Sequence, residues 1–425
     1  MLLSGGQFYS SISKTEKFLI HLENYGHLIL RGEKMNVSKT IPNIEAKDDI
    51  MGTIGDTPIV RLDGVREFFE LNNTLLAKIE FFNPGGSVKD RIGHSMLNRA
   101  RDEGKIEDGG VIVEPTSGNT GAGLAIAGSK YGCKTVFTMP NKMSKEKELL
   151  LEAFGGQVIR TPTSVAPEDP NSYYNVAEAI KKWIWEKEKI ITEEELKEIT
   201  KRVQEMVLED RLAKLRGILE RDVTPCPNAY TPNQYENMNN PLAHRRTTGP
   251  EIERQVGDEL DYLFAGIGTG GTISGVGEYL KKRTRFNLIG IDPEGSIISL
   301  AKQGMDEDEA KKEAESYLTE GIGEDLIPET TNLEIIDDIV NTTDQFSFST
   351  ARLLARKEGI LAGGSSGSAL CGTIKYLKEN RIEGSTVLVI FPDTGRNYLT
   401  RLFDDGWMRR NGLETNDERV LEGLK

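Results

Sequence analysis

The sequence predicts an α/β protein built from parallel sheets that are covered by helices on both faces. Two observations support this fold class. From residue 54 onward, short apolar runs typical of strands alternate with helical patterns, as expected when successive parallel strands are joined by helices. Several of these runs also end in loops rich in Gly, Ser and Thr. Because ligands bind at the carboxyl ends of parallel strands, those loops are the places to look for a functional site.

Each element is expected where its own periodicity is clearest. Apolar runs bounded by turn residues predict strands at 75–80, 111–114, 135–139, 157–160, 262–266, 288–292 and 386–391. Apolar residues at helical spacing predict helices between them, at 121–131, 144–154 and 272–282.

Two segments stand outside this alternation. Residues 1–45 are expected to be an N-terminal extension, since their apolar runs are too short and too interrupted for a secretory signal, and either Met1 or Met35 can be the start of translation. Residues 176–222 are dense in Glu, Lys and Arg and have no strand pattern. They predict one or two amphipathic helices inserted into the α/β frame, and we expect a solvated excursion in preference to a partner-binding element.

The composition narrows the class of function. The 425 residues include 53 basic and 67 acidic side chains, a net charge of −14, which argues against nucleic acid or an anionic membrane as the main partner. No apolar run approaches the roughly 18 residues of a membrane span. Cys133, Cys226 and Cys371 are far apart and odd in number, which favours a reducing compartment, the cytosol, and no zinc site.

The most informative stretch is 83–91, Asn-Pro-Gly-Gly-Ser-Val-Lys-Asp-Arg. It places Lys89 just after a Pro-Gly-Gly turn, where a helical pattern begins. Glycines let the backbone approach a ligand, and a helix start offers unpaired N–H groups. A lysine there can form a Schiff base with a carbonyl if its ammonium loses its proton readily, although the stretch alone also fits a surface lysine after a loop.

Three further loops follow strands and enter helices. Residues 114–121 combine hydroxyl and glycine residues, and suit a carboxylate or phosphate as well as an ordinary helix cap. The small residues and hydroxyls of 362–368 permit close backbone approach and neutral polar contacts, although they also fit a loop packed tightly against its neighbours. Residues 266–272 match the Gly-x-Gly-x-x-Gly pattern, and the next strand ends at Asp292. That loop therefore also leaves open a nicotinamide-dependent dehydrogenase.

Taken together, 83–91, 116–121, 268–272 and 363–368 resemble the pyridoxal-phosphate enzymes of fold type II. This group contains cysteine synthase, cystathionine β-synthase, serine dehydratase and tryptophan synthase β, and the likeness runs from about 54 to 408, apart from the insertion at 176–222. It implies two open, twisted, mostly parallel sheets, with a catalytic domain over 46–425 and a smaller mobile subdomain over about 90–170. In this group the glycine loop holds the cofactor phosphate. Within it the sequence is most similar to cystathionine β-synthases, while 247–252 and 392–395 lean toward cysteine synthases.

The resemblance implies a role for each matching residue. Lys89 would hold pyridoxal phosphate covalently and then transfer the substrate's α-proton. The other residues implied to bind the cofactor are Asn119, Gly268, Thr269, Gly270, Gly271, Thr272 and Ser365, the last facing the pyridine nitrogen. Those implied to bind the substrate are Thr116, Ser117, Thr120, Gln234, Tyr235, Gly321 and Gly323.

The sequence also departs from the family pattern. The Cys and His pair of haem-containing members has no counterpart before Cys133, so no haem is expected, and no C-terminal regulatory module is expected in a chain ending at Lys425. Glu324 stands where cystathionine β-synthases usually have tyrosine. A carboxylate there would repel an anionic second substrate.

The resemblance implies a homodimeric lyase that joins serine and homocysteine into cystathionine and releases water, and that can also produce hydrogen sulfide, and the cysteines favour a cytosolic location. Its partners would be small amino acids, without a metal, nucleic acid or membrane. The alternatives are a cysteine synthase that uses O-acetylserine and sulfide, the dehydrogenase, and a catalytically weak sensor that keeps the fold.

Overall fold

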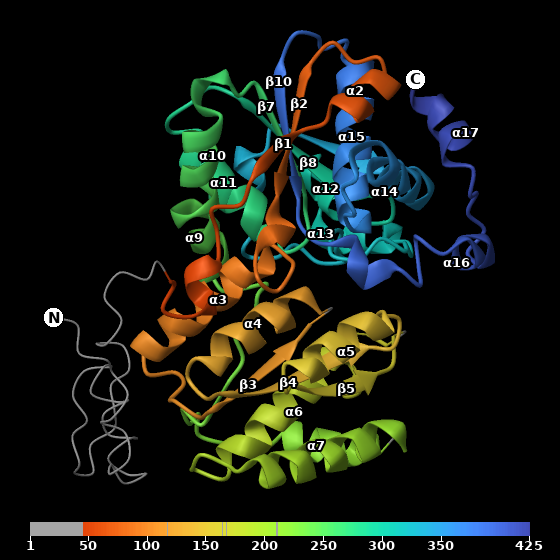
Figure 1. Cartoon of the computed structure of the whole chain (residues 1–425). Coiled ribbons are helices and arrows are strands. Elements are labelled where there is room, and N and C mark those ends of the chain that lie inside the picture. Colours follow the sequence, from red (N-terminus) through yellow and green to blue (C-terminus); the bar gives the residue numbers. More distant parts are fainter. Residues whose placement is uncertain (1–45, 117, 164, 167, 210) are drawn as a thin grey trace, which may run out of the picture. The chain divides into compact units, whose positions relative to one another are not determined.

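The computed structural model describes residues 46–425 apart from 117, 164, 167 and 210. The predictions for 1–45, including the choice between Met1 and Met35, and for Ser117 lie outside the described residues. From Asp49 to Lys425 the chain forms one compact unit that contains two sheets (Figure 1). The predicted α/β class with two mostly parallel sheets is confirmed.

The larger sheet has six strands in the order β1-β2-β10-β7-β8-β9. All neighbours are parallel except β1, which pairs antiparallel with β2 at the edge. The strands are β1 (Ile59–Arg61), β2 (Thr74–Ile79), β7 (Tyr262–Gly266), β8 (Asn287–Pro293), β9 (Asp338–Thr342) and β10 (Thr386–Phe391).

The central strand β10 shows why this sheet forms. Val387, Val389 and Phe391 pack into the core on one face, while Leu388 and Ile390 pack into the core on the other. A strand buried on both faces needs apolar residues throughout rather than alternation. The first face is covered by α14 (Asp344–Glu358) and α15 (Gly364–Glu379), and the second by α10 (Thr248–Gln255) and α11 (Gly271–Leu280).

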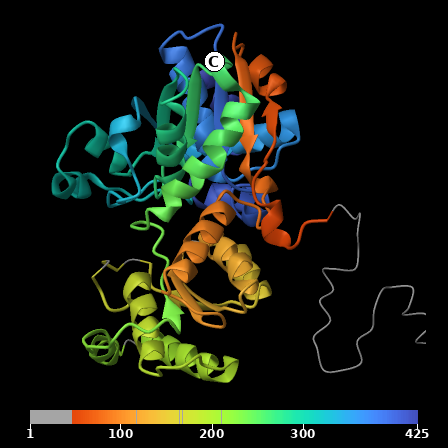
Figure 2. The same ribbon diagram turned by 90° about the vertical axis from the view of Figure 1, so that its left-hand side faces the viewer.

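The smaller sheet has four parallel strands in the order β5-β4-β3-β6. They are β3 (Val111–Pro115), β4 (Lys134–Pro140), β5 (Gln157–Thr161) and β6 (Ala229–Tyr230). One face packs against α4 (Asn119–Ser129) and α5 (Lys145–Ala153), and α3 (Lys89–Asp102) lies on α4. The other face is covered by α6 and α7, as the two views in Figures 1 and 2 show.

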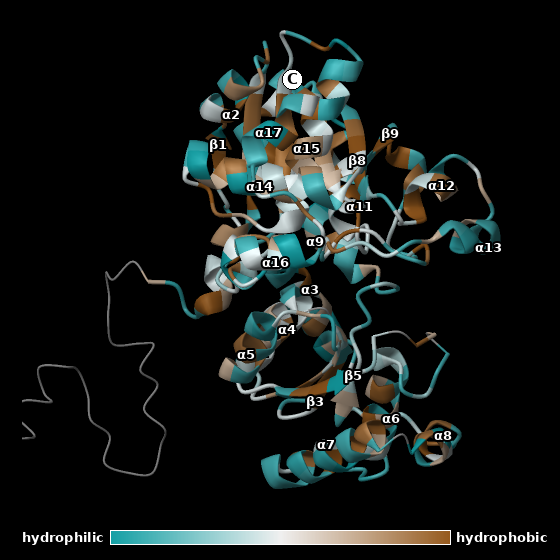
Figure 3. Cartoon of the chain, turned by 90° about the vertical axis from the view of Figure 1, so that its right-hand side faces the viewer, coloured by the Kyte–Doolittle hydropathy of each residue, from teal (hydrophilic) through white to brown (hydrophobic). Residues whose placement is uncertain are grey.

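The charged segment 176–222 differs from the expected solvated excursion of one or two helices. It contributes to three helices, α6 (Tyr173–Trp185), α7 (Glu193–Leu208) and α8 (Leu212–Leu219). Their apolar residues, among them Val176, Ile180 and Val203, form one core cluster with Val113 and Ile159 of the sheet. Figure 3 shows hydrophobic and hydrophilic residues side by side along α7. The charged residues therefore indicate the outer faces of these helices, whose apolar inner faces cover the second face of the smaller sheet.

Three strands were not predicted, namely β1, β6 and β9. β6 has two residues and β1 has three, which is too short for a period to be visible. The remaining helices are α2 (Asp63–Phe68), α9 (Asn239–Arg246), α12 (Ile298–Lys302), α13 (Glu307–Ala310), α16 (Asp405–Arg410) and α17 (Asp417–Leu421). None of the helices that the structure describes has the length and apolar composition needed to cross a membrane.

Candidate active site

Lys89 is the first residue of α3 and follows the Pro-Gly-Gly turn. Its Nζ lies 3.5 Å from Thr269 Oγ1. Burial lowers the pKa of Lys89 to about 8, although the charges of Glu324 and Asp393 act in the opposite direction. The neutral amine is therefore available at a much lower pH than in a free lysine. This is the state that attacks a carbonyl.

A buried ion cluster fixes the start of α3. Arg91 pairs with Glu80 at 2.7 Å and with Glu251 of α10 at 2.7 Å. Lys78 of β2 also pairs with Glu251, at 2.8 Å. At most 8% of any of these four side chains is exposed. The cluster therefore ties the helix that begins with Lys89 to the larger sheet and to α10.

The glycine-rich loop 266–272 joins β7 to α11, and Gly270 is the N-cap of that helix without a side-chain cap. Gly271 and Ile273 in the first turn are buried. Around the loop, Asn240 Nδ2 donates to Thr269 Oγ1 at 2.9 Å. An uncapped and buried helix N-terminus with flanking hydroxyls is a good site for a phosphate.

Substitution of Gly270 tests whether this loop binds a phosphate. Its φ is +72°, a conformation that costs a residue with a Cβ about 1–2 kcal/mol, and the added Cβ would overlap the side chain of Thr331. We expect Gly270→Ala to weaken binding of a phosphate-bearing cofactor at least tenfold, which equals about 1.4 kcal/mol. The matched control is Gly257→Ala, because Gly257 has φ +58° and nothing within 4 Å. Equal affinities of the two variants in a fluorescence titration would contradict this assignment.

The loop after β3 leads into α4, whose N-cap Gly118 likewise has no side-chain cap. Asn119 Nδ2 donates to Asp393 Oδ2 at 2.8 Å, and Thr120 Oγ1 donates to Gln234 Oε1 at 2.6 Å. Thr116 is buried, and its Oγ1 accepts from the backbone N–H of Gly118 at 3.1 Å. Thr116, Asn119, Thr120 and Gln234 therefore lie together at the carboxyl end of the smaller sheet.

Ser365 lies in the first turn of α15, where 3% of the residue is exposed. Asp393 links this helix start to α4, because its backbone oxygen accepts from Gly363 N at 3.1 Å while its carboxylate accepts from Asn119. The helix starts that carry Ser365 and Asn119 thus share one neighbour. Burial raises the pKa of Asp393.

A cavity of about 740 Å³ opens beside these loops. Its lining includes the predicted residues Tyr235, Gly321 and Gly323, together with Glu320 and Glu324. The backbone N–H of Gly323 donates to Ile267 O at 2.7 Å, so the Gly-Ile-Gly loop lies directly against the glycine-rich loop.

Sequence reasoning missed the role of Asp393 and the contacts that Glu320 makes in this site. Asp393 directly follows β10, so the rule that loops after strands carry ligands could have identified it. Glu320 pairs with Lys147 at 2.6 Å and with Arg401 at 2.7 Å. Since these partners are distant in sequence from Glu320 and from each other, no local motif signals that contact.

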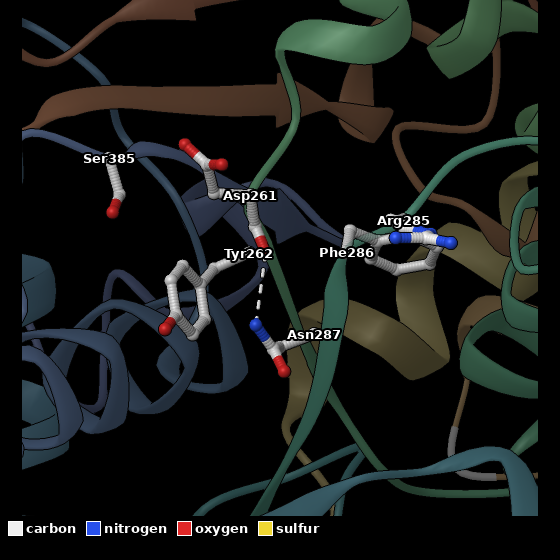
Figure 4. A pocket seen from close by; sticks show the side chains of 6 residues that line it. All are labelled: Asp261, Tyr262, Arg285, Phe286, Asn287 and Ser385. Atoms are coloured by element: carbon white, nitrogen blue, oxygen red, sulfur yellow. Dashed lines mark hydrogen bonds between the residues drawn. The ribbon is translucent and has the colours of Figure 1, made fainter.

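A second pocket, of about 350 Å³, lies at the amino ends of β7, β8 and β10. Figure 4 shows its lining residues, among which Asn287 Nδ2 donates to Asp261 O at 3.5 Å. This is the end of a parallel sheet opposite to the one where ligands usually bind, and we assign it no site. Within the described part of the chain, no group of three His, Cys, Asp or Glu side chains could hold a metal ion.

Comparison with known proteins identifies the family. Residues 50–393 match the family model described as pyridoxal-phosphate dependent enzyme. The chain is 38% identical over 371 residues to cystathionine beta-synthase of Oryctolagus cuniculus, covering 87% of this chain and 59% of that protein. For the enzyme of the same name from Saccharomyces cerevisiae, the identity is 36% and the coverage 90% and 68%. The chain thus spans about three fifths to two thirds of the length of these relatives.

Solved structures give the same relationship. The O-acetylserine dependent cystathionine beta-synthase from Helicobacter pylori matches with a TM-score of 0.63 and 34% identity, covering 84% of this chain and 99% of that one. A hydrogen sulfide-producing enzyme from Fusobacterium nucleatum matches with a TM-score of 0.64 and 29% identity, covering 83% and 100%.

The residues present fit pyridoxal phosphate. Its phosphate needs convergent N–H and hydroxyl donors, which the uncapped start of α11 and Thr269 and Thr272 can supply. Its aldehyde needs an amine that loses its proton easily, and the desolvated Lys89 lies 3.5 Å from that same loop. The family match over 50–393 agrees with this donor set. The chain belongs to the pyridoxal-phosphate dependent enzymes, and it is similar within them to the cystathionine beta-synthases.

Proposed function

We propose that the protein catalyses β-replacement on serine, joining it with homocysteine to give cystathionine and water. The observation that carries this proposal is the desolvated amine of Lys89 beside the uncapped start of α11. The names of its relatives support the choice of reaction. When bound, pyridoxal phosphate supplies an acceptor for the negative charge that develops at the substrate's α-carbon.

The chain's own residues bind and orient both molecules. We assign the cofactor to Lys89, Asn119, Ser365 and the loop Gly268–Thr272. A substrate carboxylate suits the uncapped start of α4, where Thr116 and Thr120 provide hydroxyls and Gln234 is already bonded to Thr120. Tyr235, Gly321 and Gly323 line the cavity through which substrates enter, and we assign Ser117 to the substrate from its position in the same loop.

Lys89 then moves a proton at the substrate's α-carbon. An amine with a pKa of about 8 is matched to this task near neutral pH. Ser365 places a neutral hydroxyl, rather than a carboxylate, in the buried first turn of α15. We assign it to the pyridine nitrogen, which then stays largely unprotonated and favours prompt loss of the β-substituent.

Two wider features belong to the same proposal. The free cysteines at 133, 226 and 371 suit a reducing compartment, and we propose a cytosolic homodimer.

We also propose that the part built on the smaller sheet, over about 90–170, moves relative to the larger sheet when substrate binds, since the cavity is lined from both parts.

A second candidate is the synthesis of cysteine from O-acetylserine and sulfide. Glu324, which lines the cavity, favours it, because cystathionine β-synthases usually have tyrosine at this position. The similar structure from Helicobacter pylori is named as O-acetylserine dependent.

A paired product assay decides between the two. Purified protein with pyridoxal phosphate is given serine with homocysteine in one reaction and O-acetylserine with sulfide in the other, and the products are identified by mass spectrometry. We expect cystathionine in the first reaction. Cysteine in the second reaction alone would assign the protein to the cysteine synthases. No product in either, with the cofactor bound, would contradict both candidates and favour a sensor.

A further inference from the structure

Glu324 lines the cavity, and hydrogen bonds fix its backbone. Its backbone N–H donates to Ser296 Oγ at 3.1 Å, and its backbone oxygen accepts from the same hydroxyl at 3.2 Å. The residue lines the 740 Å³ cavity together with Tyr173 and Tyr235. Among the residues that the structure describes, none makes a hydrogen bond or ion pair with its carboxylate. The backbone of Glu324 is thus fixed, while its carboxyl group has no partner among the described residues and can contact a molecule that occupies the cavity.

The same carboxyl lies close to the reactive amine. Glu324 directly follows the Gly-Ile-Gly loop, which lies against the glycine-rich loop through the bond from Gly323 N to Ile267 O. Lys89 Nζ approaches that glycine-rich loop at Thr269. The charges of Lys89 and Glu324 are near enough to interact. Lys89 and Glu324 are therefore two acid-base groups of opposite type whose charges interact, and Glu324 is the one that lines the cavity.

The surroundings keep the carboxyl largely protonated near neutral pH. Burial and the like charge of Asp325 raise the pKa of Glu324 to about 8, and Asp292 acts in the same direction. Lys89 and Lys142 oppose this shift. The neutral tyrosines that line the cavity add no charge. A carboxyl that titrates near the working pH can both donate and accept a proton.

We propose that Glu324 is a second proton-transfer residue of the cleft, which protonates the departing oxygen and later accepts the proton of the incoming thiol. This inference rests on the proposed β-replacement. In the first half, Lys89 takes the α-proton, the C–H electron pair becomes the Cα–Cβ double bond, and the Cβ–O bond breaks with its pair on oxygen. Glu324 protonates that oxygen, and water leaves.

The second half of the reaction returns Glu324 and Lys89 to their starting protonation states. The thiol S–H proton passes to the carboxylate of Glu324, and a sulfur lone pair forms the Cβ–S bond. The π pair returns to Cα, which takes the proton back from Lys89. Over the cycle no proton or electron pair is gained or lost by the protein. Hydroxide is a poor leaving group, so the first transfer matters for serine and not for a substrate that releases a stable anion.

Glu324→Gln tests this, because it keeps the size of the side chain and removes its proton. Both β-substrates are assayed near pH 8 with sulfide, which is then largely ionised and needs no base, so that the product is cysteine in each case. With serine we expect kcat/KM to fall at least about 100-fold. With O-acetylserine, which releases acetate, we expect a change of less than about threefold. Glu329→Gln is the control, since it removes an exposed carboxylate that is close in sequence but does not line the cavity.

An equal loss on both substrates would assign Glu324 a structural role and overturn the inference, as would no loss on either. An independent readout uses the cofactor-free protein. The pKa of the buried Glu114 is also raised to about 8, so the spectrum of Glu324→Gln is subtracted from that of the wild type, and the difference should show a neutral carboxyl band that disappears with a midpoint near pH 8. Absence of this band would overturn the inference even if neither substrate reacts, whereas an inactive wild type that shows the band would overturn the proposed function alone.

Discussion

Lys89→Ala should abolish the visible absorption of covalently held pyridoxal phosphate and lower turnover by at least about three orders of magnitude. The variant loses both the amine that captures the aldehyde and the group that moves the α-proton. It keeps the uncapped start of α11, so the phosphate should still bind reversibly. Absorption spectra, equilibrium dialysis and the product assay separate these effects.

The rate of cofactor capture by the wild type gives a second test of the same residue. Because burial lowers the pKa of Lys89 to about 8, the neutral amine, and with it the capture rate, should rise through a midpoint near pH 8. A free lysine would give a midpoint near about 10.4. Lys105→Ala, which removes an exposed lysine beyond α3, should behave as the wild type. Retained absorption and turnover in Lys89→Ala would exclude Lys89 as the cofactor's anchor.

Glu251→Gln should be strongly destabilising. It would leave Lys78 and Arg91 buried without the carboxylate that pairs with both, and breaking such a pair costs about 3–5 kcal/mol. Although burial acts against its charge, the hydrogen bonds and charges of Arg91 and Lys78 lower the pKa of Glu251 to about 2. Its shift from an ordinary value corresponds to about 3 kcal/mol, which agrees.

Urea unfolding of the cofactor-free protein measures this effect. Since the folded-state pKa is depressed, the contribution of Glu251 is fully present above the ordinary pKa of a glutamate. It is lost as the pH falls from there through about 2. Glu259→Gln, at an exposed position just after α10, should change the free energy of unfolding by less than about 0.5 kcal/mol. Equal costs for the two variants would contradict a role for the cluster.

The parts of the fold that were predictable are those with a local signature. The strand at 262–266 was predicted with the bounds of β7, because an apolar run between turn residues is a local property. The glycine-rich loop and Lys89 were recognisable for the same reason. The spacing of glycine, hydroxyl and lysine residues is set by the backbone conformations that each loop needs.

What escaped prediction depends on contacts between distant residues. The sequence of 176–222 did not reveal that α6 and α7 cover the smaller sheet. Its many charged residues dominate the pattern, and the apolar residues between them indicate a buried face only once the sheet beneath them is known. Arg91 and Glu251 are 160 residues apart, and the sequence around each of them gives no indication that they form an ion pair. For the same reason the unpaired carboxyl of Glu324 becomes informative only when its neighbours are known.

The packing of α3 has a further, kinematic consequence. Gly93 and Gly123 bring α3 and α4 so close that a Cβ on Gly123 would lie 2.6 Å from the carbonyl oxygen of Lys89. The same helix is fastened to the larger sheet through Arg91. Because α3 is held by both parts of the molecule, we expect Lys89 at its start to keep its position when the part built on the smaller sheet moves as proposed.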